Sequence, residues 1–261
     1  MDPAAIAGLI LGVGAIVGGQ VLEGGRIQSI LQPTAALIVL GGTLGATTLS
    51  FPLADLLRAI RLAMSIFFNP SVTPESLISE IVELANTMRK EGVLALEEHL
   101  STITHPFLRA GIRYAVDGFE PAMTRELLET DLTVQDEAEE AGAKVFEAAG
   151  GYAPTVGILG AVLGLIHTME SLNDPSKLGE GIAVAFVATV YGVGSANLLF
   201  LPIANKIKRQ LAQARICKEV IIQGVLAVQE GLNPRLLQEK LRMYLAEQRP
   251  AGQVQAPENE G

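Results

Sequence analysis

The feature that most constrains this chain is a pair of apolar segments, residues 148–169 and 181–205, that contain no Asp, Glu, Lys or Arg. A helix needs about 20 apolar residues to cross the hydrocarbon core of a bilayer, and both segments reach that length. The short loop between them carries charges such as Glu170, Asp174 and Lys177. The sequence therefore predicts two membrane-spanning helices joined as a hairpin, over residues 148–205.

Each of these two segments carries a stripe of small side chains. Positions i, i+4, i+7 and i+11 of a helix lie on one face, so a neighbouring helix can approach such a stripe closely. The stripes are Gly157, Ala161, Gly164 and Thr168 in the first segment and Ala185, Thr189, Gly192 and Ala196 in the second. Helix packing explains the stripes, and so does a narrow polar path whose ionisable group comes from another chain. The stripes alone favour helix packing, and the rest of the sequence has to decide between the two interpretations.

Two further uncharged segments, residues 3–22 and 27–54, precede the hairpin. The first contains glycine pairs at GxxxG spacing, which suit close helix packing in a membrane. Its glycine run has neither the spacing nor the βαβ context of a dinucleotide-binding loop. Because Asp2 and the absence of basic residues do not fit a cleaved signal peptide, we expect this segment to be a retained span. Residues 1–54 are thus predicted to form spans one and two.

Composition agrees with a membrane protein and excludes several other classes. Of the 261 residues, 49% are hydrophobic, and the mean hydropathy is +0.37. A net charge of −9 without basic runs argues against nucleic-acid binding. The single cysteine, Cys217, excludes an intrachain disulfide. No phosphate-binding loop, nucleophile elbow, HExxH motif or histidine cluster occurs, so we expect no enzyme activity, no metal and no cofactor.

The remaining segments are soluble in character. Residues 55–147 hold 17 acidic and 8 basic residues, and they show helical signals and no useful strand pattern. Thr73-Pro74 is a good helix start, since Thr caps and Pro fits the first turn. We predict a helical domain at 55–147, helices at 206–248 and a disordered tail at 249–261. The predicted fold class is an all-α integral membrane protein with four transmembrane helices.

The basic residues predict the orientation of the chain. Of 19 Lys and Arg residues, only Arg26 and Lys177 fall in the two short loops, and the others lie on one side if four spans are correct. The positive-inside rule then places both termini and the domain at 55–147 in the cytoplasm.

None of the four spans contains Asp, Glu, Lys or Arg, although ionisable residues inside a membrane are the usual mark of an ion pathway. If ions cross here, a partner must supply the carboxylate. The spans offer hydroxyls, including Thr189, and the helix-distorting prolines Pro154 and Pro202. A hydrogen bond of Thr189 to its own helix is an equally good account of that residue.

At these residues the sequence resembles the MotA/TolQ/ExbB ion-channel family, and within it the four-span branch of flagellar motor stator subunits. The matching pieces lie along essentially the whole chain. They include Glu23-Gly-Gly, Gln32-Pro-Thr, Arg89-Lys-Glu-Gly-Val-Leu-Ala-Leu-Glu97, Ala153-Pro-Thr-Val-Gly-Ile-Leu-Gly-Ala161, Ala185-Phe-Val-Ala-Thr-Val-Tyr-Gly192 and Glu230-Gly-Leu-Asn-Pro-Arg235.

The resemblance implies a homo-oligomer, a pentamer around two copies of a MotB-like partner in the bacterial inner membrane. That partner has a single span with an aspartate and a domain that binds peptidoglycan, and its aspartate would be the missing carboxylate. Ion passage would step the ring, and the cytoplasmic domain would turn the rotor switch protein FliG. We expect membrane lipid around the spans and no nucleic-acid partner.

The resemblance also implies roles for single residues. Arg89 and Glu97 match the charges that engage FliG, although a pair of solvated surface charges is the simpler reading. Pro154 and Pro202 match prolines that couple ion flow to conformational change, and Thr189 matches a threonine facing the pore. We further expect Ala161 to belong to the ion pathway with Thr189, and we expect close packing of small side chains against the partner helix at Gly157, Gly164, Ala185 and Gly192.

The prediction of the coupling ion depends on two positions that lack a hydroxyl group. Sodium-driven relatives usually carry Thr at the positions of Ala161 and Ala188. Na⁺ needs several oxygen ligands once it sheds water, whereas a proton needs only the carboxylate and a hydrogen-bonded relay. The sequence therefore favours H⁺ over Na⁺.

Two other functions are compatible with four uncharged spans. One is a TolQ/ExbB-like channel that energises other envelope machinery, although those relatives have three spans and an outside N-terminus. The other is a membrane scaffold that conducts nothing.

Overall fold

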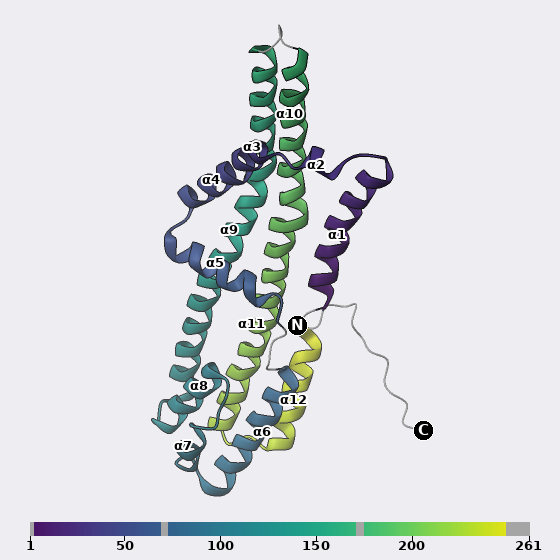
Figure 1. Cartoon of the computed structure of the whole chain (residues 1–261). Helices are drawn as coiled ribbons and strands as arrows, with labels where there is room; N and C mark the ends of the chain where they lie inside the picture. Colours follow the sequence, from purple (N-terminus) through teal and green to yellow (C-terminus); the bar gives the residue numbers. More distant parts are fainter. Residues whose placement is uncertain (1–2, 69–72, 171–174, 249–261) are drawn as a thin grey trace, which may run out of the picture. The chain divides into compact units, whose positions relative to one another are not determined.

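A computed structural model of the chain describes residues 3–68, 73–170 and 175–248 (Figure 1). The described residues are almost wholly helical and contain no strand, which confirms the predicted all-α class. They form two compact units, Met1–Asn69 with Ala138–Gln210 (the first unit) and Pro70–Glu137 with Leu211–Gly261 (the second unit). The tail predicted at 249–261 lies outside the described residues.

The helices follow one another with short connections. The first unit contains α1 (Pro3–Leu22), α2 (Ile27–Ile30), α3 (Pro33–Ala36), η1 (Leu37–Gly41), α4 (Gly42–Ser50), α5 (Leu53–Ser65), α10 (Pro175–Ser195) and η2 (Ala196–Phe200). The second contains α6 (Pro74–Glu91), α7 (Ala95–His99), α8 (Pro106–Val116) and α12 (Pro234–Gln248). Two long helices, α9 (Pro121–Glu170) and α11 (Leu201–Gln229), contribute residues to both units.

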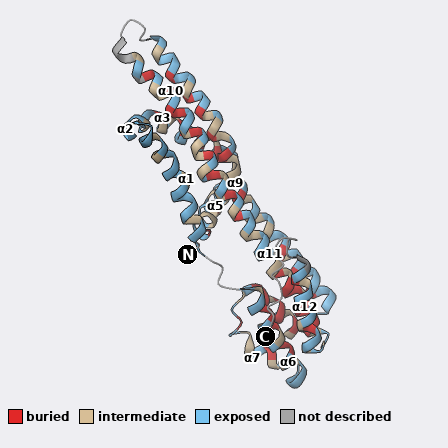
Figure 2. Ribbon diagram, turned by 90° about the vertical axis from the view of Figure 1, so that its right-hand side faces the viewer, coloured by how far each residue is buried: buried red, intermediate tan, exposed pale blue. Residues whose placement is uncertain are grey.

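Four helical stretches are long and apolar enough to cross a membrane, namely Pro3–Leu22, Ile27–Ser50, Pro121–Glu170 and Gly181–Gln229. This confirms the predicted number of spans. The last two hold 50 and 49 residues, well above the roughly 20 that a bilayer requires. Only their apolar parts are therefore membrane spans. In Figure 2 helix α1 is pale blue along most of its length, in keeping with its lack of buried residues.

Span two is interrupted near its start. Leu31 leaves the helical conformation (φ −95°, ψ 88°), Gln32 is extended, and Pro33 begins α3. The Tyr191 hydroxyl of α10 closes this break, since it donates to the Ile30 carbonyl at 2.6 Å and accepts from the Gln32 N–H at 3.3 Å. Backbone polar groups at membrane depth need partners, and one side chain supplies two here.

A π-helical turn, η2, precedes Pro202. Proline has no N–H, and in a regular helix its ring clashes with the carbonyl four residues earlier, here that of Leu198. η2 runs through this position, and the Leu201 N–H bonds to the Ala196 carbonyl five residues back. The wider turn makes room for the ring, and such turns are frequent at functional sites.

The second unit has a helical core of its own. Thr73 caps α6 by accepting the Ser76 N–H at 3.2 Å, and the helix ends at Gly92, whose φ of +88° favours glycine. A Cβ at Gly224 of α11 would lie 2.7 Å from Cγ2 of Ile81, so α6 and α11 pack closely. The largest fully buried side chains of this core are Leu77, Ile81, Leu96, Ile103, Leu108, Ile112, Leu128, Ile221, Leu237 and Leu241.

Candidate functional site

The small-residue stripes of α9 and α10 face each other within this chain. A Cβ at Gly157 would lie 3.0 Å from both the Ala188 carbonyl oxygen and the Gly192 Cα. A Cβ at Gly192 would lie 2.6 Å from the Ala153 carbonyl oxygen. These neighbours are backbone atoms, which cannot swing aside as a flexible side chain can. The two helices therefore touch backbone to backbone.

The same contact continues toward the α9–α10 loop. A Cβ at Gly164 would lie 2.7 Å from the Ala185 amide nitrogen and 2.9 Å from the Gly181 carbonyl oxygen. The structure thus brings Gly157, Gly164, Ala185 and Gly192 together in one interface between two helices of the chain. No further helix fits between them at these residues. Their contact with a partner helix stays a prediction.

Gly160 adds a third helix to this interface, and our sequence reasoning did not single it out. A Cβ there would lie 2.9 Å from the Ala188 Cβ and 3.2 Å from Cγ2 of Ile38 in span two. The spacing of Gly160 from Gly157 and Gly164 was the available signal. Ala161, the next residue, is partly exposed.

The two prolines lie on helices that contact each other. A Cβ at Gly150, one turn before Pro154, would lie 2.6 Å from Cδ2 of Leu201, the residue before Pro202. Ala153, just before Pro154, is buried in one apolar cluster with Phe200 of η2. Each proline removes a hydrogen bond from its helix and weakens the turn in which it lies. The contacts of Gly150 and Ala153 therefore bring the two weakened turns close together.

Two threonine hydroxyls of α9 and α10 bond to the backbone of their own helices. Thr189 donates to the Ala185 carbonyl at 3.3 Å, which is the structural account considered for it above, and Thr155 donates to the Tyr152 carbonyl at 2.8 Å. Both threonines are exposed in the chain, among exposed apolar residues such as Phe186. Each oxygen keeps lone pairs that can accept a hydrogen bond from another group.

Thr43 of span two is a polar residue that our sequence reasoning overlooked. It is fully buried, and its Oγ1 is without a hydrogen-bond partner among the described residues. Thr47, one turn on, is also buried and donates to the Thr43 carbonyl at 2.8 Å. Two threonines four residues apart in an uncharged span were the available signal.

Arg89 and Glu97 lie in the second unit on α6 and α7, on either side of the turn at Gly92. Both side chains are exposed, and no ion pair of either is found in the described parts of the chain. Their opposite charges are therefore available to a partner. Neither residue has an ion pair in the described residues that would explain its charge by a contribution to stability.

A charged cluster in the second unit joins α9 and α11. Asp136 lies 3.3 Å from Arg215 and 3.6 Å from the buried Lys218, and Arg215 also bonds to Glu219 at 3.0 Å. The bond to Glu219 raises the pKa of Arg215, with a further contribution from Asp136. These contacts satisfy most of the charge, so we assign the cluster to the packing of the two helices.

Two other groups of the second unit have shifted pKa values. Burial lowers the pKa of His105, and the nearby charge of Lys218 adds to this effect. Burial likewise raises the pKa of the Cys217 thiol, with a smaller contribution from Glu75. His105 is therefore held neutral and Cys217 is held as a thiol, so neither is prepared for acid–base or nucleophilic chemistry.

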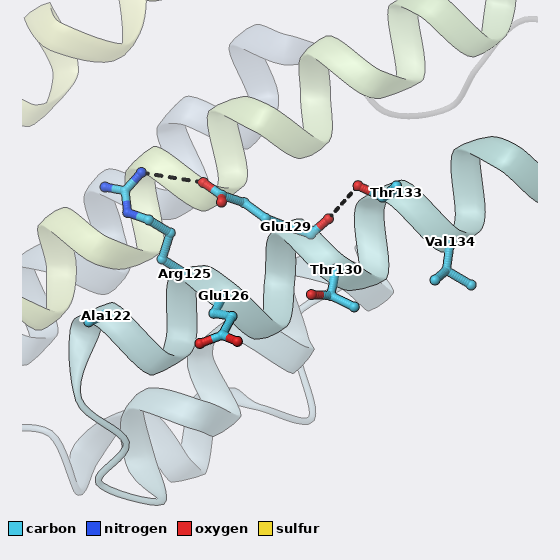
Figure 3. Close-up of a pocket in the computed structure, with 7 residues that line it drawn as sticks. All are labelled: Ala122, Arg125, Glu126, Glu129, Thr130, Thr133 and Val134. Atoms are coloured by element: carbon cyan, nitrogen blue, oxygen red, sulfur yellow. Dashed lines mark hydrogen bonds and ion pairs between the residues drawn. The ribbon is translucent and has the colours of Figure 1, made fainter.

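The described residues offer one open depression, and it does not form an enclosed site. The depression in Figure 3 is lined by residues of one helix only, between Ala122 and Val134 of α9, and Arg125 pairs there with Glu129 at 3.5 Å. One helix face cannot enclose a ligand. Among the described residues no group of three or more His, Cys, Asp or Glu could hold a metal ion.

Taken together, these features define a class: a helical, multi-pass membrane protein with uncharged, closely packed spans and a separate charged helical unit. Comparison with known proteins narrows the class. The sequence profile of the MotA/TolQ/ExbB proton channel family matches residues 99–249, and that of the motility protein A N-terminal domain matches residues 6–92. The chain belongs to the MotA/TolQ/ExbB proton channel family.

Individual relatives match along nearly the whole chain. Motility protein A of Bacillus subtilis is 38% identical over 94% of this chain and 91% of its own length. Chemotaxis protein PomA of Vibrio alginolyticus is 36% identical over 97% of this chain and 99% of its own length. A solved structure of MotAB from C. jejuni superposes with a TM-score of 0.89 at 30% identity, covering 96% of this chain and 98% of that one.

Proposed function

We propose that this chain is the ion-channel subunit of a flagellar stator and that it works only with a partner that supplies the titrating acid. The observation that carries the proposal is the complete absence of Asp, Glu, Lys and Arg from four apolar spans in a member of a proton channel family. An ion that crosses such a subunit needs a carboxylate from elsewhere.

The partner is a MotB-like single-span subunit that carries a membrane aspartate and binds peptidoglycan. Two observations support it. The solved relative from C. jejuni is a MotAB structure, in which a second protein is named. In this chain α9 and α10 present Thr155 and Thr189 on exposed apolar faces, where a second helix has room. Several copies of the chain, a pentamer by family resemblance, surround the partner's span.

Force comes from a change in packing driven by each ion. One elementary charge that crosses 100 mV releases about 2.3 kcal/mol, which biases a two-state contact and leaves a packed core intact. At the glycine contacts between α9 and α10 no side chain projects between the two backbones. Pro154 weakens α9 and Pro202 weakens α11 close to these contacts. These turns are the hinges that the proposal requires. Gly157, Gly164, Ala185 and Gly192 carry the sliding contact.

The output surface is on the second unit. Arg89 and Glu97 are exposed and available, and we assign them to the rotor switch protein FliG. Charges of this kind steer and orient an encounter more than they add affinity. The match of the motility protein A N-terminal domain, which includes Arg89, favours the stator over a TolQ/ExbB-like energiser.

The chain lies in the bacterial inner membrane with both termini and the second unit in the cytoplasm, in line with the one-sided placement of Lys and Arg. The transported ion is H⁺. Ala161 and Ala188 leave the region around Thr189 without the extra hydroxyls that a dehydrated Na⁺ would need. The chain performs no bond-making chemistry of its own.

Reconstituted vesicles test the proposal. The chain is assembled with its single-span partner, alone, and with a partner whose membrane aspartate is replaced by asparagine, and proton flux is measured under a fixed potential. We expect flux only with the intact partner, at the same rate in sodium-free and sodium-containing buffer. Equal flux from the chain alone would refute the borrowed acid. No flux in any assembly would indicate a scaffold, and flux that requires sodium would overturn the choice of ion.

A further inference from the structure

Helices α9 and α11 pack closely where they leave the apolar spans. A Cβ at Gly150 of α9 would lie 2.6 Å from Cδ2 and 3.6 Å from the amide nitrogen of Leu201 in α11. Farther from the α9–α10 loop, Ala143 of α9 and Ala204 of α11 are fully buried. All these residues belong to the first unit. Because glycine and alanine form only shallow ridges on a helix, such a contact restrains sliding of one helix along the other weakly.

One ion pair joins the two helices beside this contact. Lys208 of α11 donates from Nζ to Oε1 of Glu147 of α9 at 2.6 Å, across 61 positions of the sequence. Glu147 directly precedes the uncharged segment 148–169, and Lys208 lies three residues after the uncharged segment 181–205. The pair therefore links α9 and α11 at the margin of the spans.

Along both helices the pair lies between the proline turn and the residues of the second unit. Glu147 is seven residues before Pro154, and Lys208 is six residues after Pro202. Residues 122–146 of α9 and 209–229 of α11 contain no proline, and both stretches include residues of the second unit. A change at the two weakened turns reaches the second unit along these stretches. It acts on both of them together only when the two helices keep their alignment.

The exposure of the pair decides which effect it has. The side chains of Lys208 and Glu147 are 42% and 38% exposed. Water screens an ion pair that is this exposed, so the pair contributes little to the free energy of unfolding. Opposite charges across a contact still fix the relative alignment of two surfaces, because only one alignment brings them together. The small residues of this contact leave the alignment weakly restrained, and the ion pair supplies the missing restraint.

We propose that Glu147 and Lys208 are positioning residues that keep α9 and α11 aligned during the ion-driven change in packing. The inference rests on the proposed function of an ion-driven stator, and neither residue acts on the ion itself. When ion passage changes the packing at Pro154 and Pro202, the pair makes both helices move together, so the change reaches the second unit as force. Without the pair the helices slip past each other at Gly150, and part of the change is lost.

Neutral variants test this role in the full complex. Glu147→Gln and Lys208→Met each remove one charge and keep a side chain of similar length. Proton flux is measured in vesicles that contain the chain with its single-span partner, and torque is measured in cells that rely on this stator. We expect parental flux and a parental thermal midpoint, with torque lower by up to about twofold, the change in an equilibrium that an exposed ion pair supports.

Exchange of the two charges and a matched control separate this pair from surface charge in general. Glu147→Lys with Lys208→Glu restores a pair of opposite charges and should return torque to near the parental value. Either reversal alone places like charges together and should lower torque more than the neutral variants do. The control is Glu140→Gln, which removes the 3.3 Å ion pair of Glu140 with Lys144. That pair lies within α9 alone, so torque in the control should equal that of the parent.

The alignment itself is measured without the rotor. Spin labels are attached at Glu139→Cys and Arg209→Cys, in a Cys217→Ser background in which these are the only thiols of the chain. Labelled chains are diluted with unlabelled chains in the assembled complex, so that the distance within one chain is read. We expect Glu147→Gln to broaden the distribution of label distances, and we expect Glu140→Gln to leave it as in the parent.

Several outcomes would overturn the proposal. A distribution of label distances that neither Glu147→Gln nor Lys208→Met changed would show that the pair does not align the helices. Joint losses of thermal midpoint, flux and torque would show an ordinary structural contact. Torque that the charge exchange did not restore would exclude the pair as the cause. An absence of flux in the parent would instead overturn the proposed function, and the label distances would still decide whether the pair aligns α9 with α11.

Discussion

At the scale of single residues, the glycines between α9 and α10 are the tightest constraint in the membrane unit. Their missing side chains were visible in the sequence, and the helical spacing correctly placed each set on one face. The sequence could not show that the two faces meet each other, because spacing identifies a face and does not name its neighbour. Only the backbone approach at Gly157 and Gly192 reveals that contact.

Gly192→Ala should therefore damage the protein. The new methyl group would lie 2.6 Å from the Ala153 carbonyl oxygen and 2.9 Å from the Gly157 Cα, so the helices must separate. Overpacking of this kind costs about 1–3 kcal/mol. We expect a lower thermal midpoint for the purified protein and smaller swimming rings in cells that rely on this stator.

Gly194→Ala is the matched control for that substitution. It adds the same methyl group two residues away in the same helix, where no heavy atom other than the adjoining backbone of that helix lies within 4 Å. Alanine is a better helix former than glycine, so its midpoint should be equal to or above that of the parent. Similar losses in the two variants would mean that the close contact with α9 does not limit packing.

At the scale of elements, the spans were predictable and their irregularities were not. A run of about 20 apolar residues allows few structures in a membrane, so span number follows from sequence. The break at Leu31 and Gln32 depends on Tyr191, some 160 positions away in the chain, and no local pattern reports such a contact. The π-helical turn η2 was partly predictable. Pro202 indicates that the helix is distorted at this point, but it does not determine which kind of distortion forms.

Tyr191→Phe should loosen the break in span two and leave the rest of the helix in place. It removes the bonds to the Ile30 carbonyl and the Gln32 N–H and keeps the ring packed beside Ala35 and Val39. A net loss of about 1.4 kcal/mol from these bonds corresponds to tenfold faster local opening. Amide hydrogen exchange over residues 27–36 should rise accordingly.

The opposite end of span two provides the control for this measurement. Tyr152→Phe removes the 2.9 Å hydrogen bond to Ser50 and no contact at the break. Exchange over residues 27–36 should match the parent in this variant. Unchanged exchange in Tyr191→Phe would show that the hydroxyl does not hold the break closed.

At the scale of the whole molecule, the chain consists of two units that differ in how their interiors are packed and in where their charges lie. The membrane unit is uncharged inside and held by close contacts of small residues, whereas the second unit has a conventional core of large aliphatic side chains under a charged surface. The sequence predicted uncharged spans and charged helical segments at 55–147 and 206–248; in the structure residues 55–69, 138–147 and 206–210 belong to the first unit with the spans, and residues from 211 on belong to the second. The role of Arg89 and Glu97 could be stated only through family resemblance, because exposed charges follow from no packing rule.

The double variant Arg89→Glu with Glu97→Lys tests that role at the level of the working motor. Both side chains are exposed and without ion pairs in the described residues, and changes at such positions alter stability by less than about 0.5 kcal/mol. Proton flux and the thermal midpoint should therefore stay at parental values, while swimming is lost.

The control reverses the neighbouring exposed charges, as Lys90→Glu with Glu98→Lys. Cells with this control variant should swim. An equal loss of swimming in the control would show a general effect of surface charge and would contradict a specific rotor contact by Arg89 and Glu97. A fall in proton flux would show that these residues act in ion conduction instead.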